Sequence, residues 1–157
     1  MASKIEVDEI FNAGGDNDTG IDLATNDQIL LKVANATRLT MNSTGQTTIV
    51  GEGGTTTTSL QQGLAKVWAH SAADGTSLSD SFNTSGITDV GTGKQQINIA
   101  NDMANVNFSV LCSYIENQTD TTHWCDGLTV TKWQQNSYHS GSYTDNEFGS
   151  VAFGDLA

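Results

Sequence analysis

The sequence predicts an all-β fold, and three observations support this prediction. Thr, Ser, Asn and Gly supply most of the polarity of the 157-residue chain, because only 15% of its residues are charged. Short apolar alternations recur between turn residues, with β-branched and aromatic side chains scattered through them. Proline is absent, whereas its average usage is about 5%, so every backbone N–H is available to a sheet ladder.

The first segment, residues 1–19, contains a brief alternation and then a loop. Its apolar positions are Ile5, Val7, Ile10 and Phe11, and the run AGGDNDTG that follows is rich in turn residues. The opening lacks the apolar stretch of a signal peptide. We therefore expect synthesis in a cytoplasm.

The second segment, residues 20–64, contains three expected strands at 29–33, 37–41 and 47–50. Asn35 and residues 42–45 separate them as turns, at a spacing of about ten residues that forms a weak internal repeat. Residues 20–54 carry too few apolar side chains to build a core in one chain. We therefore expect them to bury their apolar face against further copies of the chain. An ordinary meander within a larger sandwich is the alternative.

The third segment, residues 65–157, follows a linker-like stretch at 51–59 and is richer in aromatic side chains. Leu60, Leu64 and Val67 fit a short helical turn, whereas Ala65, Val67 and Ala69 fit a strand equally well. Six or seven short strands with turns every 8 to 12 residues or so are typical of a β-sandwich, here jelly-roll-like. The further strands are expected at 78–83, 86–90, 95–100, 106–115, 122–133 and 147–153.

Two cysteines, Cys112 and Cys125, flank an expected hairpin turn at residues 117–121. Pairing Val110 with Leu128 keeps the apolar side chains on one face and places the two sulfurs on opposite faces of the sheet. A slip by one residue would bring the sulfurs together but would set the apolar side chains against Thr and Gly. We therefore expect free thiols, which suits a reducing compartment.

The charge of the chain argues against two classes of partner. The formal net charge is −12, and the six basic residues are spread singly, so they do not form the clusters that neutralise a phosphate backbone. An acidic surface is also unfavourable for anionic lipid, and no apolar run approaches the roughly 18 to 20 residues of a membrane-spanning helix. We expect neither nucleic-acid binding nor membrane insertion.

Alternating acidic residues at Asp16, Asp18 and Asp22 are the weak candidates for a metal site, because alternating oxygens can gather around Ca²⁺. The calcium-loop template fails in detail, since Ile21 stands where Gly is needed and Asp27 stands where Glu is needed. A solvated turn is the simpler interpretation. A cation between copies of the chain, relieving the repulsion of like charges, is the other.

The remaining reactive side chains do not predict catalysis. His123, Cys125, His139 and Cys112 lack the close pairs of a structural zinc site, and no third group orients a thiol and histidine as a catalytic pair. No Gly-rich phosphate loop precedes a helix. Glycosidases need two carboxylates about 5 to 9.5 Å apart in a cleft, whereas the Asp residues here lie mostly in expected turns. We expect no cofactor and no enzymatic activity.

Residues 134–146, QQNSYHSGSYTDN, form the most suggestive expected surface loop. Tyr138, His139 and Tyr143 stand there among small polar residues, which is the composition of adaptable recognition loops. Trp124 and Trp133 offer stacking faces for a sugar. The alternative is that both tryptophans are core residues and the loop only links two strands.

Several of these segments resemble bacteriophage fibre proteins, especially those of cyanobacterial phages. The opening ASKIEVDEI is similar to the short extended starts of phage fibres, and ATRLTMNSTGQTTIVGEG is similar to a repeated segment of tail-fibre stems. The ordered series that resembles the distal domain of such fibres is KVW at 66–68, DSFN at 80–83, ITDVGTG at 87–93, INI at 97–99, Met103, NFSV at 107–110 and VAFGDL at 151–156.

The resemblance implies a homotrimer located in a virion. Residues 1–19 would attach to a virion tail or capsid protein, residues 20–64 would form a slender stem of intertwined β-strands, and residues 65–157 would form a β-sandwich head. The function implied is a short tail fibre or spike that contributes to attachment to a host-surface glycan or protein. A capsid decoration protein or head fibre and a depolymerising tailspike are the alternatives, and the short stem leaves the choice between tail and capsid open.

Overall fold

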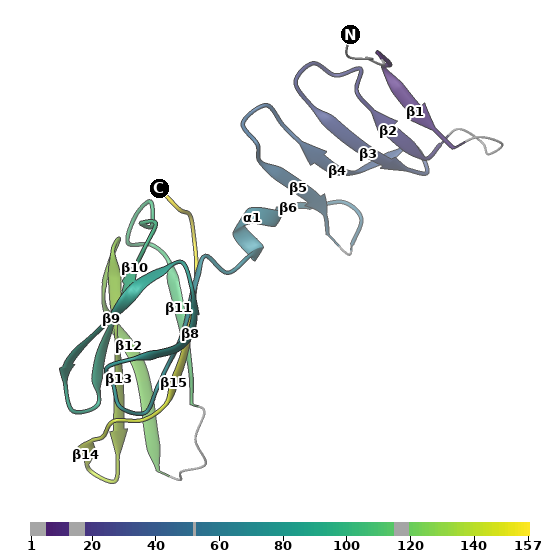
Figure 1. The fold of residues 1–157 in the computed structure, drawn as a ribbon. Helices are drawn as coiled ribbons and strands as arrows, with labels where there is room; N and C mark the ends of the chain where they lie inside the picture. The colour runs from purple at the N-terminus through teal and green to yellow at the C-terminus, as the bar shows by residue number, and fades with distance from the viewer. Residues whose placement is uncertain (1–5, 13–17, 52, 115–119) are drawn as a thin grey trace. The chain divides into compact units, whose positions relative to one another are not determined.

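The computed structural model describes residues 6–12, 18–51, 53–114 and 120–157, and it is all-β with several antiparallel sheets (Figure 1). The predicted all-β class is therefore confirmed. The chain divides into two compact units, unit 1 (Met1–Gly63) and unit 2 (Leu64–Ala157). The expected segments 1–19 and 20–64, apart from Leu64, both belong to unit 1, and their first two strands pair with each other.

The described strands of unit 1 form one antiparallel sheet in which they lie in chain order, and a one-turn helix, α1 (Leu60–Gly63), follows the last of them. The expected strands at 29–33 and 47–50 are confirmed with those bounds, and the expected strand at 37–41 begins one position earlier. The strands are β1 (Glu9–Phe11), β2 (Gly20–Asp22), β3 (Ile29–Val33), β4 (Ala36–Met41), β5 (Thr47–Val50) and β6 (Thr57–Ser59).

Two strands of unit 1 lie where the sequence predicted irregular structure. Strand β6 occupies part of the expected linker, and β2 begins at Gly20, the last residue of the expected loop. A Cβ atom at Gly20 would lie 2.2 Å from the carbonyl oxygen of Ile10 and 2.9 Å from Cδ1 of Phe11. Glycine at this position therefore permits close pairing of β1 with β2, and the loop prediction there is wrong.

One face of the unit 1 sheet carries a row of apolar side chains that crosses five strands. Residues directly opposite each other on neighbouring strands share a face, and none of these side chains is buried. We call this row the apolar ladder; its members are Ile10, Ile21, Leu31, Leu39 and Ile49.

Unit 1 has no hydrophobic core within the residues that the structure describes. Asp22 is its one buried side chain there, and every buried apolar residue belongs to unit 2. Ile29 and Met41, a cross-strand pair two residues along from the apolar ladder, are 41% and 38% exposed and border a hollow of about 540 Å³. Among the described residues of unit 1, the sheet is thus a single layer, and no second layer of this unit covers its apolar face.

Unit 2 contains two antiparallel sheets (Figure 1). One has the order β11-β15-β7-β8, and the other has the order β12-β13-β10-β9, with β14 paired to β13. The bounds are β7 (Val67–Ser71), β8 (Leu78–Phe82), β9 (Thr84–Gly91), β10 (Lys94–Ile99), β11 (Ser109–Tyr114), β12 (Thr121–Thr129), β13 (Lys132–His139), β14 (Ser142–Tyr143) and β15 (Phe148–Phe153).

Buried side chains from both sheets meet in one hydrophobic core. Val67 and Ala152 enter it from the first sheet, and Ile97 and Trp133 enter it from the second; all four are fully buried. Trp133 is therefore a core residue, as the alternative interpretation of the tryptophans held. Unit 2, unlike unit 1, completes its own core.

The expected strand at 122–133 and the expected loop at 134–146 are each wrong in part. The structure has a turn at Val130 and Thr131 that separates β12 from β13, and residues 134–139 belong to β13. Gln135, Asn136 and Ser137 are buried polar residues of β13. A run of polar residues at buried positions gives no apolar alternation, which explains why the sequence indicated a loop.

The predicted pairing of the cysteine strands is also wrong. Strand β11 pairs with β15 and β12 pairs with β13, so Cys112 and Cys125 lie in different sheets. Cys112 is opposite Ser150, and Cys125 is opposite Gln135; both partners are buried, so the two thiols point into the interior. Both cysteines are free. Burial, with a smaller contribution from Cys112, raises the pKa of the Cys125 thiol.

Candidate functional site

Three aromatic side chains gather on unit 2, on strands β12, β13 and β14; Tyr138 and Tyr143 are exposed, and Trp124 is half-buried. The ring centroids of Tyr138 and Tyr143 are 5.4 Å apart in an edge-to-face arrangement, and those of Trp124 and Tyr143 are 6.1 Å apart and tilted by 47°. These separations are in the range at which aromatic pairs attract. We call Trp124, Tyr138 and Tyr143 the aromatic patch.

A tight hairpin between β13 and β14 positions the two tyrosines. Tyr138 and Tyr143 are directly opposite each other, and Ser140 and Gly141 in the turn both have positive φ angles. The hydroxyl group of Tyr138 donates a hydrogen bond of 2.7 Å to the carbonyl oxygen of Gly141. This bond fixes the Tyr138 ring against its own turn, although 37% of the residue remains exposed.

Charged groups flank the aromatic patch on both sides. The Lys94 ammonium lies 4.2 Å from the centroid of the Tyr143 ring, a cation–π contact. On the other side, Nε1 of Trp124 donates a hydrogen bond of 3.1 Å to Oδ2 of Asp126. Two of the three rings thus contact a charged neighbour.

The tight turn beside Lys94 depends on Gly93. Its φ angle is +69°, and a Cβ atom there would lie 2.5 Å from the carbonyl oxygen of Ser137. The N–H of Gly93 donates to Oδ1 of Asp145 at 2.5 Å, and the N–H of Ser137 donates to the Gly93 carbonyl at 2.8 Å. The turn that carries Lys94 is therefore bound directly to β13.

A buried amide lies beneath the aromatic patch. Asn136 is directly opposite both Trp124 and Lys94, so the three residues form one row on the outward face of the sheet. Asn136 is only 1% exposed, and its Oδ1 accepts a hydrogen bond of 2.8 Å from Nε2 of Gln134. Its Nδ2 has no hydrogen-bond partner in the part of the chain that the structure describes. Leaving a buried donor unsatisfied costs about 1–3 kcal/mol.

His139 is the predicted recognition residue that the structure separates from the other three. It follows Tyr138 in the same strand, so its side chain leaves the opposite face of the sheet. Its Nδ1 lies 3.0 Å from Oγ1 of Thr121, and its Nε2 lies 3.2 Å from Oγ of Ser140. The structure therefore brings Trp124, Tyr138 and Tyr143 together, without His139.

The sequence reasoning missed Lys94 and Asn136. Lys94 is far from residues 134–146 in the chain, and only the pairing of β10 with β13 brings it to the patch. Asn136 lies inside the expected loop, but its burial follows from its membership of a strand. The Asn-Ser-Tyr sequence at 136–138 carries no signal that the amide is buried while the ring is exposed.

The four expected attachment residues have different positions in unit 1. Ile5 lies outside the described residues, and Val7 precedes β1 and is 45% exposed. Ile10 is the first member of the apolar ladder. Phe11 lies opposite Gly20 and packs over that glycine. Ile10 and Phe11 thus point to opposite faces of the sheet and do not form one apolar patch.

The weak metal candidates have other interactions. Asp16 lies outside the described residues, and Asp18 accepts a hydrogen bond from Oγ1 of Thr19. Asp22 forms an ion pair with Lys32 and accepts a hydrogen bond of 2.9 Å from the N–H of Ala24. Both interactions, chiefly that with Lys32, lower the pKa of Asp22. Among the described residues, no group of three or more His, Cys, Asp or Glu side chains is placed to hold a metal ion.

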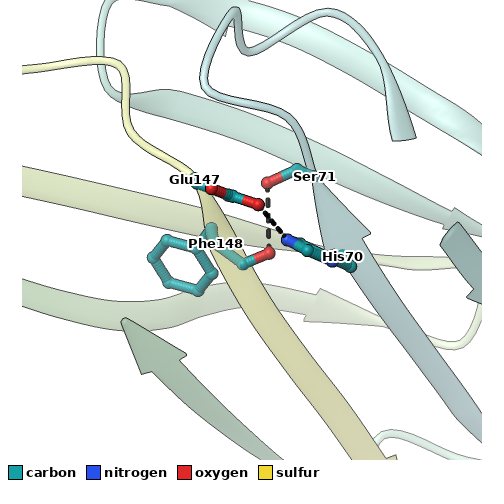
Figure 2. Close-up of polar contacts among 4 residues, drawn as sticks. All are labelled: His70, Ser71, Glu147 and Phe148. Carbon is teal, nitrogen blue, oxygen red and sulfur yellow. Dashed lines mark hydrogen bonds and ion pairs between the residues drawn. The ribbon is translucent and has the colours of Figure 1, made fainter. Parts of the chain in front are cut away.

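A second polar group, on the first sheet of unit 2, combines a histidine, a carboxylate and a serine. Figure 2 shows Nε2 of His70 against Oε1 of Glu147, at a distance of 2.5 Å. A catalytic triad would need the serine hydroxyl on the same histidine. The Ser71 hydroxyl instead donates to the carbonyl oxygen of Phe148 at 3.3 Å (Figure 2). The group therefore consists of a contact between the His70 ring and the Glu147 carboxylate and a buried hydrogen bond between Ser71 and Phe148.

Comparisons with models of known protein families, with curated protein sequences and with solved structures find no match to this chain. Within the described ranges, no helix has both the length and the apolar character needed to cross a lipid bilayer.

Proposed function

We propose that this protein is a structural component of a bacteriophage particle, a short trimeric fibre or spike that contributes to host attachment. Unit 1 supplies the stem through which three chains associate, and unit 2 is the head that meets the host surface. The chain acts by binding and not by catalysis.

The unfinished core of unit 1 is the observation that carries this proposal. A single-layer sheet with an apolar face is stable only when another layer covers that face. Every member of the apolar ladder is at least partly exposed in one chain, and the opposite face carries the Asp22–Lys32 ion pair. Copies of the same sheet are complementary to this face, because each presents the same uncharged row.

The choice of three copies rests on the resemblance to phage fibres, and the apolar face supports association in general. A two-fold pair of sheets is the competing arrangement, since two-fold dimers are the commonest homo-oligomers. The host-contacting role of unit 2 is supported by the aromatic patch, because exposed clustered Trp and Tyr side chains are enriched at recognition surfaces.

Sedimentation of the purified chain tests the stem. The expected species contains three copies of the 16.6-kDa chain. A folded monomer would overturn the proposal, and a dimer would replace the trimer with a two-sheet sandwich. Quantitative mass spectrometry of purified particles tests the location: few copies per particle indicate a tail fibre, and tens to hundreds indicate a capsid decoration protein.

A further inference from the structure

We propose that Cys112 and Cys125 form an oxidation site at which a disulfide bond joins the two sheets of unit 2. Both thiols are free in the structure, and a low-molecular-weight disulfide such as oxidised glutathione would supply the oxidant. The inference goes beyond the proposed function and does not depend on it, because both cysteines belong to unit 2 of one chain.

The two cysteines lie on strands that meet at one edge of unit 2. Among the described strands, β11 is at one end of the first sheet and β12 is at one end of the second, and these two strands contact each other. Sheets packed face to face are about 10 Å apart, whereas a disulfide joins Cα atoms that are roughly 4.4–6.8 Å apart. An edge at which strands of the two sheets meet is therefore where such a bond fits.

Two contacts between the sheets show which residues lie across from each other. The ring centroids of His123 on β12 and Phe148 on β15 are 4.7 Å apart. The Nε2 atom of Gln135 on β13 donates a hydrogen bond of 2.8 Å to Oγ of Ser150 on β15. The inward side chains of the second sheet thus reach those of the first sheet at both positions.

These contacts place the two thiols beside each other in the interior. Cys125 lies directly opposite Gln135, and Cys112 lies directly opposite Ser150. The Gln135–Ser150 hydrogen bond therefore joins the cross-strand neighbour of one cysteine to the cross-strand neighbour of the other. Cys112 also stands between the exposed residues Leu111 and Ser113, which agrees with an inward direction for its own side chain.

The environment of the thiols agrees with this geometry and sets the order of reaction. Burial raises the pKa of the Cys125 thiol, and Cys112 adds to the increase, an effect of neighbouring groups. Both cysteines are only half-buried, so a small oxidant can reach the edge at which they lie. Because the thiolate is the attacking species, we expect Cys112 to react first.

The reaction is a thiol–disulfide exchange in two steps. The Cys112 thiolate attacks one sulfur of oxidised glutathione, the glutathione S–S bond breaks, and one glutathione leaves. The Cys125 thiolate then attacks Sγ of Cys112 in the mixed disulfide, and the second glutathione leaves as the bond between the two cysteines forms. The two cysteines together lose two electrons and two protons, and the two glutathione molecules gain them.

Oxidation of the full-length folded chain tests the inference. Glu116 lies between the two cysteines in the sequence, so a glutamyl endopeptidase separates them after the reaction. Mass spectrometry without reduction should find the two fragments joined. The bond closes a loop of about a dozen residues, and we expect it to raise the melting temperature of unit 2 by about 5 °C or more.

Two variants and one condition serve as controls. Cys125→Ala should stop at a mixed disulfide between Cys112 and glutathione, and Cys112→Ser should form no bond within the chain. Neither variant should gain in melting temperature on oxidation. The unmodified chain in 8 M urea is the control for geometry, because only the folded state holds the two thiols together. We expect the bond to form about tenfold faster or more in the folded chain.

Three results would overturn the inference: no bond in the folded chain, a bond between different chains, or a bond that forms no faster without urea than with it. A bond that lowers the melting temperature would also overturn it, because the folded geometry would then oppose the link. If a variant does not fold, the comparison of the unmodified chain with and without urea decides. Sedimentation of the oxidised sample separates this inference from the proposed stem, since a trimer without the bond contradicts only the former.

Discussion

Replacing Leu31 by alanine tests whether the apolar ladder is an interface between chains. Leu31 is the central member of the ladder, opposite Ile21 on one side and Leu39 on the other. It is nevertheless 39% exposed in a single chain. If further copies cover this face, the substitution should weaken association, because it removes apolar surface that becomes buried only in the assembly.

The size of the effect follows from the exposed fraction. Complete burial of a leucine side chain contributes about 1.5–3 kcal/mol, so covering the remaining 39% contributes roughly 0.6–1.2 kcal/mol in each copy. Three equivalent copies give about 2–3.5 kcal/mol per trimer, and each 1.4 kcal/mol or so changes an equilibrium constant tenfold. The association constant should therefore fall roughly 30- to 300-fold.

Leu30 provides a control on the same strand. It follows Ile29 and precedes Leu31, so its side chain lies on the opposite face, where its cross-strand partners are Asp22 and Thr40. Leu30→Ala removes the same number of atoms without touching the ladder. Sedimentation velocity over a dilution series should show Leu31→Ala dissociating at a concentration at which Leu30→Ala remains trimeric. Equal dissociation of the two variants would refute the assignment of the interface to the ladder face.

Three further predictions concern titratable groups. Treatment with oxidised glutathione should join Cys112 to Cys125 within one chain, because both free thiols point into the interior of unit 2 from its two sheets. Mass spectrometry should show the loss of two hydrogens, and a bond between different chains would contradict this geometry. Burial lowers the pKa of His123, so the unfolded chain binds the proton first as the pH falls below about 6.5. The melting temperature should therefore be lower at pH 5 than at pH 7.5, and His123→Gln should reduce this difference. An unchanged difference in the variant would disprove the role of His123. The pKa of Asp22 is lowered in the folded state, so the stabilisation from its ion pair with Lys32 is present above the unfolded pKa of about 3.9 and is lost as the pH falls through the folded pKa. Lys32→Met should therefore destabilise unit 1 at pH 7 and have little effect in strong acid. A destabilisation that does not depend on pH would indicate lost packing instead.

The strands that could be predicted from sequence are those whose pairing is local. Strand β3 pairs with β4 and β4 pairs with β5, each across a short turn, so Ile29, Leu31, Leu39 and Ile49 appear in the sequence as the alternation that the sheet uses. Asn35 has a φ angle of 56°, which asparagine tolerates better than most residues. The turn residue Asn35 and the apolar alternation predict the same two strands here, and the structure confirms both strands.

The strands that could not be predicted depend on partners far away in the chain. Strand β11 pairs with β15, about forty residues later, although β12 follows it directly. A hairpin between β11 and β12 is the local choice, and it gave the wrong register for Cys112 and Cys125. The residues of β11 alone do not indicate whether it pairs with the neighbouring β12 or with the distant β15. The same reasoning applies to β13, where burial of Gln135 and Asn136 is a property of the assembled sheet.

Some residues of the aromatic patch could be predicted from composition, whereas its neighbour Lys94 depends on strand pairing. Composition pointed to Tyr138 and Tyr143, because Tyr among Ser, Gly and Asn indicates a recognition surface whatever the backbone does. Alternation along β13 then decided that Tyr138 faces outward and His139 does not. Lys94 entered the site through the pairing of β10 with β13. Residue type can therefore nominate a surface, whereas strand register decides which side chains share it.

The two units differ in how their apolar side chains are buried, and under the proposed function this difference would give them different tasks. Unit 2 encloses Trp133 and Ile97 completely, so its core is complete within one chain. Unit 1 leaves its ladder uncovered, so Leu31 and its neighbours are constrained by whatever covers them. Substitutions on the ladder should therefore act through assembly, and substitutions in the aromatic patch should act through recognition. Under the proposed function, such a chain would be able to alter what it binds at Tyr138 and Tyr143 while the association surface of unit 1 stays the same.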